Sequence, residues 1–141
     1  MAVGMGRILG RFVTGAVQRF IPNNMLIDAL GISSPSVSPT FGAAITIDTS
    51  PAAGSMYQLV IANAATAPTI GAPSTTINGQ RLTIQIRNSS GGAMGATTFN
   101  AIYKLGAAWT NPANNFSRTI EFMCNGTNWV EIGRTAADVA N

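Results

Sequence analysis

The stretch "QRLTIQIRN", residues 80–88, decides the fold class of this chain. Leu82, Ile84 and Ile86 alternate with polar residues, which is the two-residue period of a strand that buries one face. Similar short segments occupy residues 43–49, 55–63, 96–105, 117–124 and 128–134. They are separated by Gly, Pro, Asn and Ser, which is typical of an antiparallel sandwich or barrel. We therefore predict an all-β domain over residues 41–141, an antiparallel β-sandwich of the jelly-roll or immunoglobulin-like kind.

Two long segments between these strands are predicted to be loops, residues 65–80 and 106–117. Proline has no backbone N–H to donate and is excluded from central strands. Pro68, Pro73 and Pro112 therefore argue against central-strand pairing in these segments.

The segment "FMCNGTNWVEIGR", residues 122–134, is predicted to be a hairpin. Asn-Gly is the strongest short-range hairpin signal, because the turn needs a positive φ that Gly126 can adopt. Cys124 shares a strand face with Ile120 and Phe122, so we expect it to be a buried small hydrophobe. Trp129 is expected to anchor the returning strand, as a core or subunit-interface residue.

The composition argues against an enzyme. The chain has no histidine and one cysteine, which removes the commonest general base and any internal disulfide or cysteine-cluster metal site. The one carboxylate pair worth naming is Glu121 with Glu131, on neighbouring predicted strands, and we expect both to face solvent. No cofactor is expected. The net charge is only +3, with one lysine and dispersed arginines, so direct nucleic-acid binding is not expected.

The N-terminal arm, residues 1–30, has a different pattern. Its apolar residues recur with the period of a short amphipathic helix that Pro22 ends. The apolar face consists of Ile8, Leu9, Phe12, Val13, Val17, Phe20 and Ile21, with Arg7 and Arg11 opposite it and Arg19 near its boundary. The arm could pack on its own domain or sister subunits, or dock on another protein. The least favoured alternative is that it binds an anionic membrane or acts as an organellar targeting sequence. Residues 31–40 are predicted to be a Ser/Pro linker.

The predicted sheet edges are thinly protected. Edge strands are usually defended by charges, especially lysine, or by proline. Charged residues make up only 9% of the chain, against roughly 25% in typical soluble domains. Covering the edges with neighbouring subunits would solve this problem, so we expect a homo-oligomer.

Residues 79–139 resemble a β-rich module of tailed-bacteriophage virion proteins, found in head-decoration, head-fibre and tail-fibre chains. The resemblance lies in "LTIQIRN", the glycine-rich turn, "FNAIYKL" and the terminal "IEFMCNGTNWVEIGR". It implies a virion structural protein, usually trimeric, and it transfers no catalytic residue.

The short layout of arm, linker and one β-domain favours a capsid decoration or cement protein on the virion surface. The arm residues named above would bind the major capsid protein or another virion protein. One alternative is a fibre-type receptor- or glycan-binding module that uses an exposed aromatic such as Trp109. Against this alternative, we expect Trp109, like Trp129, to be a core or subunit-interface residue. Another is a membrane-associated protein that uses the basic arm.

Overall fold

The computed structural model describes residues 36–49, 56–61 and 66–141. These residues form strands, turns and loops, so the described part of the chain is all-β as predicted. The ten strands are β1 Ser36–Val37, β2 Ala44–Ile47, β3 Met56–Ile61, β4 Thr69–Pro73, β5 Arg81–Asn88, β6 Thr98–Phe99, β7 Tyr103–Lys104, β8 Phe116–Cys124, β9 Trp129–Arg134 and β10 Val139–Ala140. The predicted arm lies outside the described residues. Strand β1 falls within the range predicted to be a linker.

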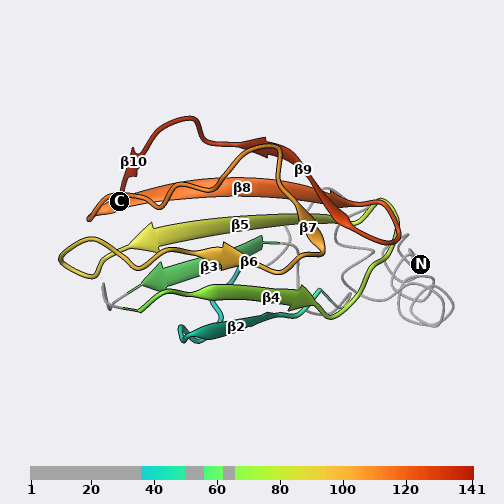
Figure 1. The fold of residues 1–141 in the computed structure, drawn as a ribbon, viewed down its shortest axis with the longest axis horizontal. Helices are drawn as coiled ribbons and strands as arrows, with labels where there is room; N and C mark the ends of the chain where they lie inside the picture. Colours follow the sequence, from blue (N-terminus) through green and yellow to red (C-terminus); the bar gives the residue numbers. More distant parts are fainter. Residues whose placement is uncertain (1–35, 50–55, 62–65) are drawn as a thin grey trace, which may run out of the picture. The chain divides into compact units, whose positions relative to one another are not determined.

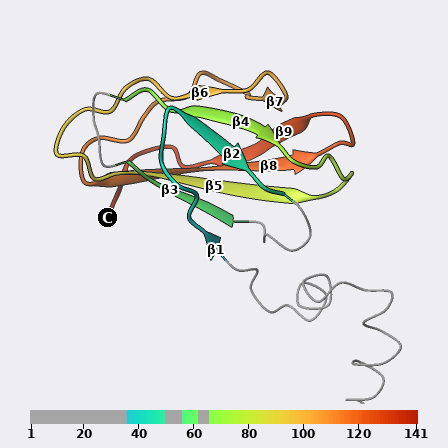
Figure 2. The same ribbon diagram turned by 90° about the horizontal axis from the view of Figure 1, so that it is seen from below.

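From β1 to β6 the chain alternates between two sheets. Strands β1, β3 and β5 belong to the larger sheet, and β2, β4 and β6 form the smaller one. Each strand pairs in parallel with the strand two places along the chain, so the path is a coil with two strands per turn. Figures 1 and 2 show the two sheets as facing layers.

The C-terminal part of the chain completes the larger sheet with different pairings. Its order is β1-β3-β5-β8-β9-β7, with β10 beside the start of β8. Strand β8 is antiparallel to β5, β9 and β10, whereas β7 is parallel to β9. The larger sheet is thus mixed and curled, and the smaller sheet is wholly parallel. The predicted antiparallel sandwich is wrong in this respect, because alternation fixes which face is buried and says nothing about strand direction.

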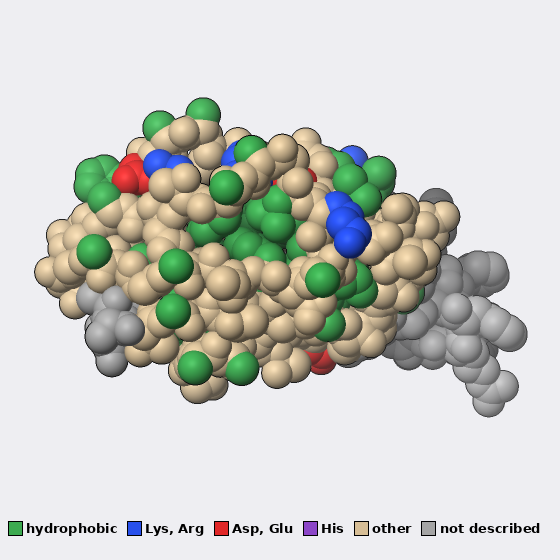
Figure 3. Space-filling view, in the orientation of Figure 1, with side chains coloured by type: hydrophobic (Ala, Val, Ile, Leu, Met, Phe, Trp, Pro, Cys, Tyr) green, Lys and Arg blue, Asp and Glu red, His purple; other side chains and the backbone are tan. Residues whose placement is uncertain are grey.

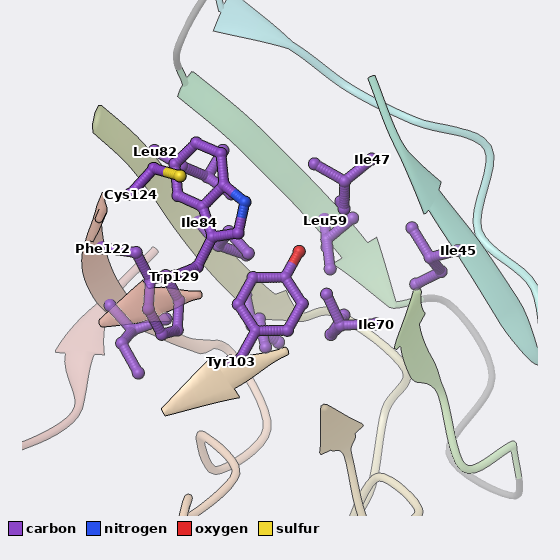
Figure 4. Close-up of a cluster of buried hydrophobic side chains, with 12 residues drawn as sticks. Ile45, Ile47, Leu59, Ile70, Leu82, Ile84, Tyr103, Phe122, Cys124 and Trp129 are labelled. Atoms are coloured by element: carbon purple, nitrogen blue, oxygen red, sulfur yellow. The ribbon is translucent and has the colours of Figure 1, made fainter. Parts of the chain in front are cut away.

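The core lies between the two layers (Figure 4). The predicted inward faces are confirmed: Leu82, Ile84 and Ile86 of β5 are at most 1% exposed. Strand β2 likewise buries Ile45 and Ile47 and exposes Thr46. Parallel register stacks Ile45 on Ile70, and Ile70 on Phe99, so successive turns of the coil place apolar side chains in one column.

Strand β4 contradicts the predicted loop over residues 65–80, because it is the middle strand of the smaller sheet. Its prolines sit where a missing N–H does no harm. Pro68 precedes the strand and accepts a hydrogen bond from the Thr98 N–H through its carbonyl, at 2.9 Å. Pro73 is the last residue of β4 and faces the core.

The predicted strand over residues 96–105 is divided between the two sheets as β6 and β7. A turn separates them, in which the Tyr103 N–H donates to the Asn100 carbonyl at 3.0 Å. The Asn100 side-chain oxygen also accepts from the Ile102 N–H at 3.1 Å. This side-chain bond is typical of asparagine in turns, and it lets the chain leave one sheet and enter the other.

The predicted hairpin over residues 122–134 is confirmed. Gly126 has φ +90° in the turn between β8 and β9. The Asn125 side chain accepts hydrogen bonds from the Thr127 and Asn128 N–H groups, at 3.1 and 2.8 Å. Cys124 pairs with Trp129 across the hairpin, and both side chains are buried as expected.

Candidate functional site

The residues predicted to bind a partner all lie in the arm, outside the described residues. They are Arg7, Ile8, Leu9, Arg11, Phe12, Val13, Val17, Arg19, Phe20 and Ile21. The candidate site that the structure does describe lies on the β-domain.

An open depression of about 700 Å³ lies beside β6, β7 and the loop that follows β7. Its lining, here called the aromatic depression, consists of Thr97, Thr98, Phe99, Tyr103, Lys104, Leu105, Ala107, Ala108 and Trp109. Figure 3 shows a hollow with hydrophobic side chains at its bottom on the face that carries β6 and β7. The lining combines aromatic and aliphatic groups with hydroxyls and one ammonium group.

Aromatic rings packed on the core support this depression. Phe99 meets Tyr103 edge-on at a centroid distance of 5.7 Å, and Tyr103 lies 4.9 Å from Phe122 below it. The Tyr103 hydroxyl donates to the Gly71 carbonyl of β4 at 3.1 Å, which ties β7 to the smaller sheet. These contacts give the depression a rigid floor that belongs to the core.

Trp109 forms part of the wall and is half-buried, in contrast to the wholly buried Trp129. Its ring meets Phe99 edge-on at 5.7 Å, and its Nε1–H donates to Asn111 at 3.1 Å. Asn111 in turn donates to the Gly95 carbonyl at 2.8 Å. Trp109 is therefore a fixed residue packed against the core that keeps part of its surface in solvent.

An ion pair at the end of β9, here called the clamp, holds the loop that carries Trp109. Arg134 hydrogen-bonds the Glu131 carboxylate and donates to the carbonyls of Ala107 and Ala108, at 2.9 and 3.0 Å. Glu131 accepts the Gly106 N–H at 2.7 Å. The clamp thus binds three consecutive residues of the loop, and the Arg134 guanidinium lies 5.9 Å from the Trp109 ring centre.

The clamp shifts the ionisation of both its members. The hydrogen bond from Arg134 holds the pKa of Glu131 below its usual value, with a further contribution from the Gly106 N–H. The same ion pair raises the pKa of Arg134. Each charge therefore stabilises the charged form of the other. The Glu131 carboxylate is used to hold the loop through Gly106 and Arg134.

The pair of Glu121 and Glu131 lies on neighbouring strands as predicted, but the two residues do not face each other. Glu121 pairs with Gly133, and Glu131 with Phe122, across a register shift. Glu121 is exposed as expected. Glu131 is not solvent-facing, because its side chain is only 11% exposed and is engaged in the clamp. The register shift and the clamp keep the two carboxylates from acting as a pair.

A second ion pair fastens the C-terminal end. Arg118 of β8 contacts Asp138 at 2.5 Å, and Asp138 also accepts the Ala113 N–H at 3.0 Å. The hydrogen bond from Arg118 lowers the pKa of Asp138. This arrangement holds β10 against the start of β8.

Residues 36–49, 56–61 and 66–141 contain no group of three or more His, Cys, Asp or Glu residues placed to hold a metal ion. The same residues include no helix long and apolar enough to cross a membrane.

Sequence reasoning missed the clamp. Glu131 and Arg134 are close in the sequence, but their shared target is a loop some 25 residues earlier. The loop position of Trp109 brings it into the glycan-binding alternative only, and no local pattern indicates that Arg134 covers its ring.

Comparisons of the chain with protein-family models, with curated proteins and with solved structures found no match. The resemblance to phage virion modules therefore rests on the sequence motifs given above.

Proposed function

We propose that this chain is a non-enzymatic structural protein of a bacteriophage virion, a decoration or cement protein that docks on the capsid through its N-terminal arm. The β-domain would sit on the shell as a trimer, and the arm would contact the major capsid protein or another virion protein. The proposal starts from the sequence motifs and from the amphipathic pattern of residues 7–21.

The observation that carries a structural role is that three of the four carboxylates in the β-domain, those of Asp48, Glu131 and Asp138, hold loops or strand ends in place. Glu131 and Asp138 each pair with an arginine and also bind a loop N–H group. Asp48 accepts a hydrogen bond from Ser74 at 2.9 Å, which joins the ends of β2 and β4. Carboxylates with these contacts hold loops to strands, which suits a protein that must keep its shape on a particle.

The outer surface of the β8–β9 hairpin supports self-association. Met123 and Val130 are direct cross-strand partners, and they are 41% and 37% exposed. Ile132, two residues along β9, is 44% exposed. Met123, Val130 and Ile132 form an exposed apolar strip without a charge. A neighbouring copy of the chain could cover this strip.

Deletion of residues 1–24 tests the docking proposal. The truncated protein should fold but lose binding to capsids stripped of this protein, as measured by co-sedimentation and occupancy. Phe12→Ser, on the predicted apolar face, should weaken binding, whereas the matched control Gln18→Ser, on the opposite face, should leave it unchanged. Unchanged occupancy after the deletion would refute the proposal.

Light scattering of the purified full chain tests the trimer. We expect three times the chain mass of 14.6 kDa. Val130→Glu should lower this mass, because it places a charge in the strip, whereas Thr76→Glu, at an exposed loop position, should not. A monomeric mass for the wild-type protein would exclude self-association through the strip.

A further inference from the structure

We propose that the aromatic depression binds a saccharide, with Trp109 as the stacking residue. This is a separate function of the β-domain, and it does not depend on how the arm docks.

The lining has the mixed chemistry that a sugar ring needs. A pyranose presents C–H groups on its faces and hydroxyls around its edge. Trp109, Phe99 and Leu105 supply apolar surface, and aromatic rings with a polar handle suit sites that are apolar on one side and wet on the other. The few polar groups around them would fix the orientation of the ligand.

Those polar groups are available at the surface of the depression. Thr98 is exposed, and its hydroxyl shares a 2.9 Å hydrogen bond with the Thr69 hydroxyl, which leaves further lone-pair capacity. Lys104 is exposed and donates to the Ala101 carbonyl at 2.8 Å. An ammonium group has three donors, so the remaining ones can reach a ligand oxygen.

The charge of the lining narrows the ligand class. The lining contains one ammonium group, that of Lys104, and no carboxylate. Glu131, which holds the adjoining loop, is bound to Arg134 and Gly106. A cationic ligand has no counter-charge here. A purely apolar ligand would leave the Lys104 and Thr98 groups without new partners. An uncharged or acidic sugar carries no positive charge, and its oxygens can accept hydrogen bonds from Lys104 and Thr98.

The stacking residue is already fixed before any ligand arrives. Trp109 is held by its bond to Asn111 and by its edge contact with Phe99. Arg134 lies over the ring, so a sugar would stack on the part of the Trp109 ring that stays exposed in the depression. A pre-positioned ring lowers the entropic cost of binding, which matters for weak ligands such as sugars.

Small side chains leave room beside the ring. Ala107 and Ala108 line the depression and are exposed, while their carbonyls bind Arg134 from the backbone. A larger side chain at either position would fill the depression without removing a clamp contact.

The test uses the indole N–H signals of the full-length protein in a nitrogen–proton correlation spectrum. The chain has two tryptophans, and Trp109→Phe assigns the two signals. Maltohexaose, chitotetraose and an oligogalacturonate are titrated separately to about 10 mM, a range suited to millimolar affinity. We expect at least one of them to shift the Trp109 signal saturably and to leave that of Trp129 in place.

Two matched variants locate the binding. Ala108→Leu should lower the affinity for the sugar that shifts the Trp109 signal by about tenfold or more, because the larger side chain fills the depression. Ala137→Leu makes the same change at an exposed position outside the lining and should leave the affinity unaltered. The proposal is overturned if none of the three sugars shifts the Trp109 signal, or if Ala108→Leu binds as well as Ala137→Leu does.

Discussion

Arg134, the last residue of β9, covers the ring of Trp109 in the loop between β7 and β8, with its guanidinium carbon 5.9 Å from the ring centre. The same guanidinium binds two carbonyls of that loop and the carboxylate of Glu131. One side chain thus fixes both the path of the loop and the position of its aromatic residue.

Arg134→Ala should release the loop. The variant loses the ion pair with Glu131, two hydrogen bonds to backbone carbonyls and the contact with Trp109, so its free energy of unfolding should fall by about 1–3 kcal/mol. Trp109 should become more exposed, which a red shift and stronger acrylamide quenching of tryptophan fluorescence would report. The control Arg81→Ala removes an exposed arginine of β5 and should change neither quantity. An unchanged fluorescence spectrum in Arg134→Ala would show that the clamp does not position the ring.

The contribution of the clamp to the stability of the fold should decrease as the pH falls. The pKa of Glu131 is lowered in the folded protein, so the folded state binds this proton less readily than the unfolded state does. The stability from Glu131 is fully present above its unfolded pKa and is lost as the pH falls through its folded pKa. Denaturant midpoints measured from pH 7 to pH 3 should therefore fall less steeply in Glu131→Gln than in the wild type. Equal slopes would mean that Glu131 makes no net contribution.

Substitution by alanine should destabilise the protein at one glycine and be tolerated at another. A Cβ on Gly95 would lie 2.7 Å from the backbone nitrogen of Ala67 and from the backbone oxygen of Thr66. Backbone atoms cannot easily move away, so Gly95→Ala should destabilise the protein by about 1–3 kcal/mol. A Cβ on Gly133 would meet nothing closer than Glu121 Oε2, at 3.9 Å. Gly133→Ala should therefore be neutral or slightly stabilising in thermal unfolding, and the reverse ranking would contradict this packing.

Thr97→Val should stabilise the protein. The Thr97 hydroxyl is buried and has no hydrogen-bond partner among the described residues. An unsatisfied buried hydroxyl costs roughly 1–3 kcal/mol, and valine replaces it with a methyl group of similar size. A gain in the denaturant midpoint is the expected result, with Thr76→Val at an exposed position as the control. A loss of stability would show that the hydroxyl has a partner.

Cys124 should report opening of the core. It is the single cysteine of the chain, and it is 1% exposed in the core cluster that also contains Phe122 and Trp129. A thiol reagent should label it slowly in buffer and completely in denaturant, because reaction requires the strands around it to open. Mass spectrometry measures the labelled fraction. Complete labelling of the native protein within the mixing time would place the thiol at the surface.

The sequence predicted the buried faces well, because a two-residue period is a local property. Leu82, Ile84 and Ile86 alternate with polar side chains, and any strand pairing that buries one face must bury these three. The Asn125–Gly126 turn was predictable for the same reason, since its positive φ depends on the glycine itself.

Strand direction was not predictable in this way. Strand β4 is "TIGAP", with a glycine inside and a proline at its end, so its own residues argue for a loop. It is a central strand because β2 and β6 flank it. The partners of a parallel strand are remote in the sequence, and no local pattern identifies them.

The candidate site was predictable only in part. Trp109 stood out as a loop aromatic, but the depression beside it is built from β6, β7 and a loop held by Arg134. The position of the depression depends on the division of residues 96–105 between the two sheets. The sequence pattern predicts one continuous strand there.

The alternation of the chain between two sheets has a consequence for the order in which the protein folds. Ser36 pairs with Met56 and Thr69 with Thr98, so these partners are 20 and 29 residues apart, whereas Cys124 and Trp129 are 5 apart. Closing long loops costs entropy that only later contacts repay, so the β8–β9 hairpin is the cheapest nucleus. Strand β5 needs β8 as its antiparallel neighbour, and the coil then grows back toward β1. The order of strand formation that we expect therefore runs from the β8–β9 hairpin back toward β1, against the order of the strands in the sequence.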